Sequence, residues 1–134
     1  MKNLLLVLFL VGLFVQPCYA GLKVIGKGDS MRLDPSGFPP EMKAAYEIMK
    51  VKCVKCHTLE RTIVAIQTGI APISGQPFDR GATKAYGVKM LRKPDSNMNK
   101  QEVKATVDLM NYLLDEVYKV LHPSRTNFSP RPAK

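Results

Sequence analysis

The stretch Cys53-Val54-Lys55-Cys56-His57 places two thiols three residues apart and an imidazole directly after the second thiol. Residues at positions i and i+3 share one face of a helical turn, so both thiols can reach the same edge of a flat ligand. C-x-x-C-H is the attachment pattern of c-type haem, in which the thiols form thioethers and the histidine binds the iron. The sequence therefore predicts one covalent haem c on Cys53 and Cys56, with His57 as an axial iron ligand.

Three other interpretations compete for this motif. A redox-active cysteine pair is typical of a βαβ context, which the sequence does not indicate. A zinc site needs four ligands, and the only further candidate is the remote His122. Chance occurrence is the third. An export signal, flanking helical segments and the lack of other cysteines after residue 20 all argue against chance.

The first 20 residues have the three parts of a secretory signal peptide. Lys2 supplies the positive start, residues 4–15 are an unbroken apolar run, and Cys18-Tyr19-Ala20 offers a cleavage site. The apolar run is too short for a membrane anchor, which needs about 20 residues. Val15-Gln16-Pro17 does not resemble a lipobox, so a lipid on Cys18 is disfavoured. We expect a soluble periplasmic protein that begins at Gly21.

Composition narrows the classes of partner. The 134-residue chain carries 20 Lys and Arg against 11 Asp and Glu, a formal net charge of +9. Without interleaved aromatics or a nucleic-acid motif, this charge does not indicate nucleic-acid binding. It fits attraction to an acidic protein partner, and a merely solvated basic surface is the alternative. No long apolar run follows residue 20, so we expect no stable membrane insertion.

The rest of the chain divides into three parts. Residues 21–40 are rich in Gly and Pro and are expected to form an extended arm, and residues 122–134 form a basic, Pro-rich tail that is expected to be disordered. Between them, residues 41–121 read as one helical domain. There is no internal repeat and no convincing strand, so we expect a small all-α fold with a thin core, which the apolar surface of a buried haem would supplement.

Helical periodicity predicts three segments before the last helix. The first follows Pro39-Pro40 and leads into Cys53, since proline suits the first helical position. The second is a short apolar stretch, and the third is weakened by an internal glycine and ended by Pro94. A loop precedes the third segment. The second segment, the loop and the third segment cover residues 58–67, 68–79 and 80–92.

The last helix has the clearest signals. Asn99 is a favourable N-cap and Glu102 follows three residues later, which is a capping-box pattern. Pro123 ends the helix. An apolar stripe along it predicts the face that packs on the core. Its members are Val103, Val107, Met110, Leu114, Val117 and Leu121.

The second axial ligand is expected to be a methionine. His122 is the only other histidine, so ligation by two histidines is improbable. A thioether stabilises ferrous iron and raises its potential, which suits an electron-transfer haem. The candidates after residue 20 are Met31, Met42, Met49, Met90, Met98 and Met110.

The positions of these methionines in the chain distinguish the better ligand candidates from the others. Those at 42, 49 and 110 lie on helical stripes and are explained as core fillers. Met31 lies in the arm. Met98 directly precedes the N-cap Asn99 and can pack as a hydrophobic staple on Val103. Met90 has no such explanation, so we predict that it is the distal ligand, with Met98 as the alternative.

The order of helix, C-x-x-C-H, loop, methionine and long last helix over residues 41–121 resembles that of exported, bacterial, monohaem class I c-type cytochromes. Three stretches carry the resemblance further: Thr58-Leu59-Glu60-Arg61, then Tyr86-Gly87-Val88-Lys89-Met90, then Leu91-Arg92-Lys93-Pro94-Asp95-Ser96. The resemblance implies a small cytochrome c-like helical domain wrapped around one covalently bound haem. It also implies that the haem iron is held between His57 and Met90.

The resemblance also implies a function. Such a protein is not an enzyme but a one-electron carrier between exported redox proteins, and lysines near the motif would orient an acidic redox partner. These are Lys50, Lys52, Lys55 and Lys89. Two alternatives stay open: a gas sensor or weak peroxidase with an open sixth position, and an electron-transfer subunit of a larger dehydrogenase.

Two finer expectations concern the surroundings of the haem. The Pro72 carbonyl is a candidate acceptor for the His57 Nδ1–H, a contact that would fix the tautomer, although a plain loop proline explains Pro72 equally. One basic side chain is expected to meet a haem propionate, although each singly reads as a solvated charge. The candidates are Arg61, Arg80, Arg92 and Lys93.

Overall fold

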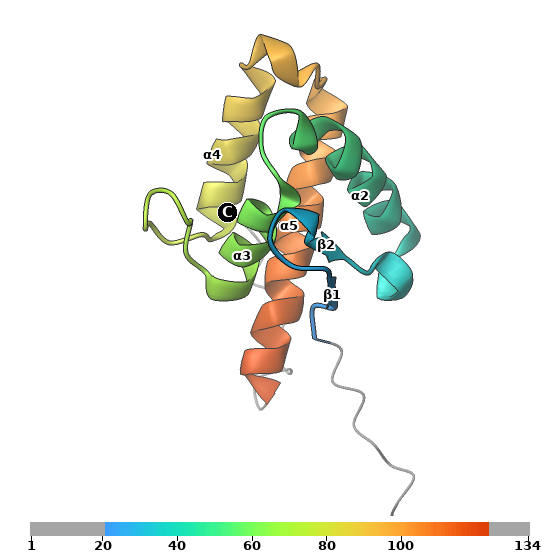
Figure 1. The fold of residues 1–134 in the computed structure, drawn as a ribbon, viewed down its shortest axis with the longest axis vertical. Coiled ribbons are helices and arrows are strands. Elements are labelled where there is room, and N and C mark those ends of the chain that lie inside the picture. The colour runs from blue at the N-terminus through green and yellow to red at the C-terminus, as the bar shows by residue number, and fades with distance from the viewer. Residues whose placement is uncertain (1–20, 124–134) are drawn as a thin grey trace, which may run out of the picture.

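The computed structural model describes residues 21–123 and shows a mainly helical protein (Figure 1). The predicted signal peptide and residues 124–134 of the predicted tail lie outside the described residues. The elements follow the chain in this order: β1 (Val24–Ile25), η1 (Gly28–Ser30), β2 (Arg32–Leu33), η2 (Pro35–Gly37), α2 (Pro40–Lys52), η3 (Cys53–Lys55), α3 (Leu59–Thr68), α4 (Arg80–Leu91), η4 (Pro94–Ser96) and α5 (Lys100–Leu121).

The N-terminal segment packs against the helices. Strands β1 and β2 pair antiparallel, with Val24 opposite Leu33. Leu33 is buried, and its backbone N–H donates to the Tyr46 hydroxyl of α2 at 2.8 Å. The prediction of no strand was therefore wrong, because a two-residue strand is too short for the alternation that marks a strand in sequence.

An aromatic cluster joins this segment to two helices. The Phe38 ring meets the Tyr46 ring of α2 edge-on, with the ring centroids 6.0 Å apart. The same Phe38 ring meets Tyr112 of α5 edge-on, with the centroids 5.7 Å apart. Edge-to-face contacts of this kind are favourable beyond the area that they bury. Phe38 thus ties residues before α2 to both α2 and α5.

The helix boundaries follow local chemistry, and the four predicted helical segments are confirmed to within about a residue. α2 begins at Pro40, where the missing N–H costs no intrahelical bond. α3 is followed by Gly69 in the left-handed conformation, with φ of 68°. α4 is capped by the Asp79 side chain, which accepts from the Ala82 N–H. α5 has the predicted capping box of Asn99 and Glu102.

α5 is the central element, packing most extensively against α2 and α4 (Figure 1). Its most buried side chains are Thr106, Leu109, Met110 and Leu113. The predicted stripe is therefore only partly right, since Leu121 is 66% exposed. The stripe overlaps the buried face at Met110 and also covers positions that border a cavity.

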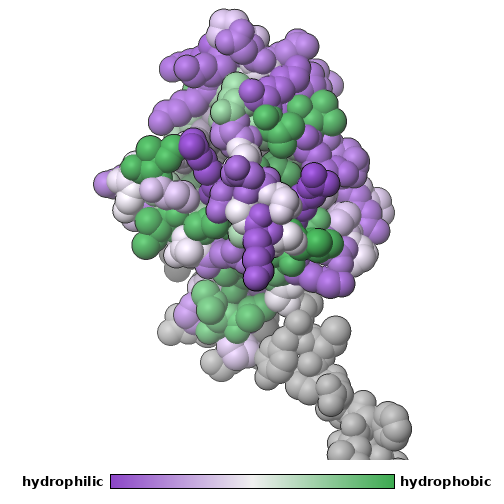
Figure 2. All heavy atoms as spheres, in the orientation of Figure 1, coloured by the Kyte–Doolittle hydropathy of each residue, from purple (hydrophilic) through white to green (hydrophobic). Residues whose placement is uncertain are grey.

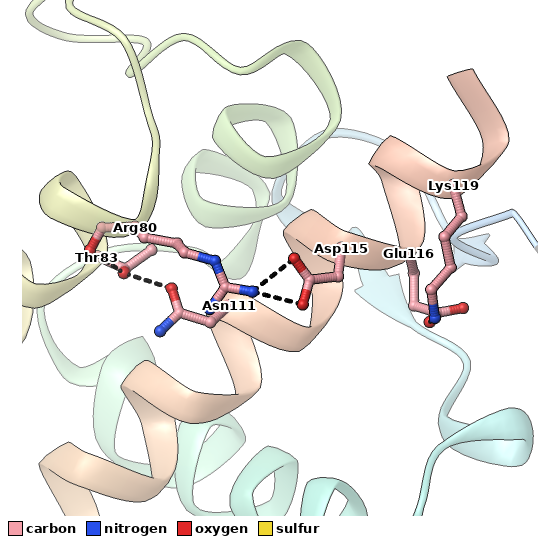
Figure 3. A network of polar contacts seen from close by, with 6 residues as sticks. All are labelled: Arg80, Thr83, Asn111, Asp115, Glu116 and Lys119. Carbon is pink, nitrogen blue, oxygen red and sulfur yellow. Dashed lines mark hydrogen bonds and ion pairs between the residues drawn. The ribbon is translucent and has the colours of Figure 1, made fainter. Parts of the chain in front are cut away.

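Close packing and polar contacts hold α4 on α5. Gly87 lies so near α5 that a Cβ atom there would be 2.6 Å from Val107 Cγ2. Figure 3 shows Arg80 of α4 reaching both carboxylate oxygens of Asp115 on α5, at 2.7 and 2.6 Å. In the same view the Thr83 hydroxyl lies 2.7 Å from Asn111 Oδ1.

The surface is mainly polar on the face drawn in Figure 2. Hydrophilic residues gather over the upper end, where α4 connects to α5, and hydrophobic residues form separate groups. Between residues 21 and 123, the structure contains no helix with both the length and the apolar character needed to cross a membrane.

Candidate functional site

A largely apolar cavity lies among α2, α3, α4 and α5 and contains about 840 Å³ of empty space, part of it open to solvent. Most of the wall is aliphatic or aromatic. These side chains include Ala65, Ala71, Ile73, Phe78, Tyr86, Val103 and Val107.

The two motif cysteines take different positions in the turn that follows α2. Cys53 is buried on the cavity wall, whereas Cys56 is exposed and is not part of the lining. Both are free thiols, and the Cys56 N–H donates to the Cys53 carbonyl at 3.4 Å. Burial, with a smaller contribution from Cys56, raises the pKa of the Cys53 thiol to about 11. The structure thus brings Cys53 to the cavity and leaves Cys56 at the adjoining surface.

His57 also lines the cavity. Its Nδ1 lies 2.9 Å from the Thr58 carbonyl oxygen. Because a carbonyl only accepts, this contact requires the proton on Nδ1 and leaves the lone pair on Nε2, the atom then available to a metal. Pro72 is part of the cavity wall as well, but the acceptor that the structure gives to Nδ1 is Thr58.

Four methionines border the same cavity. Met49 and Met110 also belong to the buried core, in agreement with their interpretation as core fillers. Met90, near the end of α4, and Met98, just before α5, are only partly buried. The structure therefore brings both predicted ligand candidates to the cavity that His57 lines. Sharing the wall does not distinguish Met90 from Met98.

Several cavity residues escaped the sequence analysis. Val103 and Val107 were assigned to a core-packing stripe, yet they line the cavity. Phe78 lies in the loop before α4, and its ring centroid is 5.6 Å from that of Tyr86. No sequence pattern marks Phe78, because its position depends on the loop, where its N–H donates to the Gly69 carbonyl at 2.7 Å. For Val103 and Val107, the apolar stripe along the last helix was the only sequence signal, and it did not separate core positions from cavity positions.

The basic residues predicted as candidates for a propionate contact lie at different places in the structure. Arg61 lines the cavity. Arg80 instead pairs with Asp115 through both carboxylate oxygens. Lys93 borders a neighbouring, more polar cleft together with Lys52. Arg61 is thus the candidate that the structure places at the site.

The described part of the chain holds no cluster of side chains that could serve as the four ligands of a zinc site. Over residues 21–123, no three or more His, Cys, Asp and Glu side chains are grouped so that they could hold a metal ion. His122 packs beside Tyr118, with ring centroids 4.3 Å apart, and does not line the cavity.

Comparisons of this chain with protein-family models, with curated proteins and with solved structures gave no significant match.

Proposed function

We propose that this chain is a monohaem c-type cytochrome that is exported to the periplasm and carries single electrons between redox proteins. The observation that supports it most strongly is one apolar cavity whose wall holds Cys53, His57 and two partly buried methionines. In a c-type haem the cysteines attach the porphyrin, and an imidazole and a methionine sulfur bind the iron, so these side chains around an apolar space match the needs of that group. The C-x-x-C-H motif supplies the second thiol at the adjoining surface.

The residues present fit the group in four respects. Cys53 and Cys56 would form the thioethers, and His57, with Nδ1 engaged by the Thr58 carbonyl, would present Nε2 to the iron. Met90 would supply the sixth ligand, with Met98 as the alternative. Arg61 would offer a positive charge to a propionate.

When bound, the haem supplies a one-electron ferric–ferrous couple. The work of the protein is to hold the ligands and exclude water. The valines of α5 and the aromatic pair Phe78 and Tyr86 would cover the ring with apolar surface, and a methionine ligand favours the ferrous state. No side chain then needs to act on a substrate, so the protein is not proposed to be an enzyme.

The charge around the cavity favours an acidic protein partner. From residue 80 to residue 93 the chain has five basic residues and no acidic one: Arg80, Lys84, Lys89, Arg92 and Lys93. Lys89 extends over the Tyr86 ring on the cavity wall, with Nζ 5.2 Å from the ring centroid. A basic surface beside the cofactor would attract a partner with an acidic patch.

The two alternatives differ from this proposal in different ways, one in haem ligation and the other in assembly. A sensor or weak peroxidase needs an open sixth position, and the presence of both Met90 and Met98 at the cavity favours a filled one. A permanent subunit of a larger dehydrogenase would use the same site, and it differs in its assembly rather than in its haem ligation.

Spectroscopy of the purified holoprotein tests the proposal. The ferric wild type is expected to show the methionine–iron charge-transfer band near the red edge of the visible spectrum. Met90→Ala should lose this band, lower the reduction potential and bind imidazole more readily. Met98→Ala is the matched control and should keep the band, with a loss of about 1 kcal/mol in stability if its packing at the start of α5 is lost.

A five-coordinate, high-spin ferric wild type would count against the proposal and favour the sensor or peroxidase. Loss of the band in Met98→Ala but not in Met90→Ala would contradict the assignment of Met90 and give the sixth position to Met98.

A further inference from the structure

The connection between α4 and α5 contains a buried serine beside a ligand candidate. Ser96 is 4% exposed, and its Oγ lies 2.7 Å from the Met90 carbonyl oxygen and 2.8 Å from the Lys93 carbonyl oxygen. Both partners only accept, so the single hydroxyl proton is shared between them. We propose that Ser96 is a positioning residue that holds the Met90 backbone where its sulfur can stay on the iron. This inference rests on the proposed function.

The position of Met90 makes such a tie useful. Met90 is the penultimate residue of α4, where the last carbonyls have no intrahelical partner and the helix end frays. A methionine side chain has three rotatable bonds, so its sulfur is placed only as well as its backbone. The Lys93 N–H donates to the Met90 carbonyl at 3.1 Å, and the Ser96 hydroxyl adds a second donor from inside the protein.

The segment that carries Ser96 is also anchored to α2. Lys52, the residue directly before Cys53, donates from Nζ to the Asn97 carbonyl at 2.6 Å. The same ammonium lies 3.5 Å from the carboxylate of Glu102. Asn97 is left-handed, with φ of 47°, a conformation that asparagine tolerates better than most residues. The end of α2, directly before Cys53, is thereby tied to the segment whose Ser96 bonds to Met90.

A merely structural serine would also satisfy two buried carbonyls, so the test needs a second buried hydroxyl that bonds to the backbone of α4, the helix that carries Met90. Thr83 provides it. It is fully buried in the first turns of α4, donates to the Arg80 carbonyl at 2.9 Å and lies away from the cavity wall. Loss of either hydroxyl should cost stability, but only Ser96 should affect the iron ligand.

The experiment measures the imidazole dissociation constant of the ferric holoprotein and its methionine charge-transfer band. Ser96→Ala should tighten imidazole binding about three- to tenfold, because the competing Met90 loses the support of one hydrogen bond. Its band should weaken. Thr83→Val, measured beside it, should unfold at a lower denaturant concentration yet bind imidazole within about twofold of wild type on the same affinity scale.

Wild-type imidazole affinity in Ser96→Ala, or equal tightening in both variants, would overturn the inference. Met90→Ala separates this failure from a failure of the proposed ligation: if Met90→Ala leaves the affinity unchanged, Met90 is not the ligand. If Ser96→Ala yields no holoprotein, Lys52→Met removes the donor to the Asn97 carbonyl, releases the same segment from α2 and should tighten imidazole binding. Unchanged affinity in Lys52→Met would then overturn the inference.

Discussion

At the scale of single residues, backbone partners explain why polar side chains occupy the interior. The Tyr46 hydroxyl is buried because it accepts the Leu33 N–H, and Thr83 is buried because its hydroxyl meets the Arg80 carbonyl and Asn111. Within residues 21–123, no buried side-chain nitrogen or oxygen lacks a hydrogen-bond partner. Such pairing is required because an unpaired polar group in the interior costs free energy.

Tyr46→Phe should lower the free energy of unfolding by about 1–3 kcal/mol, because it leaves the buried Leu33 N–H without an acceptor. Guanidinium titration followed by circular dichroism measures the change. Tyr112→Phe is the control, since it keeps the ring that meets Phe38 and removes a hydroxyl without that role. Equal losses in the two variants would contradict the importance of the Leu33–Tyr46 bond.

At the scale of elements, α4 and α5 meet closely where they border the cavity. Gly87 permits this approach, since an added Cβ would lie 2.6 Å from Val107 Cγ2 and 3.2 Å from Val103 Cγ1. Those two valines are also cavity residues. The spacing between α4 and α5 therefore sets the width of the site as well as the packing of the fold.

Gly87→Ala should destabilise the protein by about 1–3 kcal/mol through overpacking, although alanine is the better helix former by about 1 kcal/mol. Thermal unfolding measures the loss. Adding Val107→Ala should relieve the contact, so the double variant should be more stable than the sum of the two single losses predicts. Strict additivity would show that the helices do not press on each other at Gly87.

The elements differ in how far sequence predicts them. The caps at Asp79 and Asn99 and the proline at the start of α2 are local signals, so the helices could be placed from sequence. The β1–β2 pair could not, because two-residue strands depend on contacts such as that between Leu33 and Tyr46. For the site, the motif identified Cys53 and His57. The contribution of Phe78 to the cavity wall, by contrast, arises from tertiary packing that no local pattern encodes.

At the scale of the whole molecule, charge and apolar surface are arranged unevenly. The segments around the motif and along α4 are basic, whereas α5 is nearly balanced, with four acidic residues against three lysines. The cavity that these elements enclose is apolar, so an occupant would add to the small core of a short chain. This arrangement suits a basic docking face beside an enclosed cofactor.

The salt dependence of electron exchange with small redox reagents should reveal the positive charge beside the cavity. Added salt should slow oxidation of the ferrous protein by the anionic ferricyanide and should speed oxidation by a cationic cobalt complex. Lys89→Glu should weaken both salt effects. Lys119→Glu, which alters a lysine paired with Glu116 on the far part of α5, should change them less. Equal effects of the two substitutions would show that net charge, rather than its location beside the cavity, controls the rates.

Covalent haem attachment at Cys53 and Cys56 is the central claim, and the mass of the exported protein tests it most directly. After expression in a host that exports and matures c-type cytochromes, the mature chain should begin at Gly21 and exceed its sequence mass by one haem. The haem should stay with the protein through acid–acetone extraction, and Cys53→Ala with Cys56→Ala should abolish attachment. A mature chain at its bare sequence mass, or haem that extracts freely, would contradict the account.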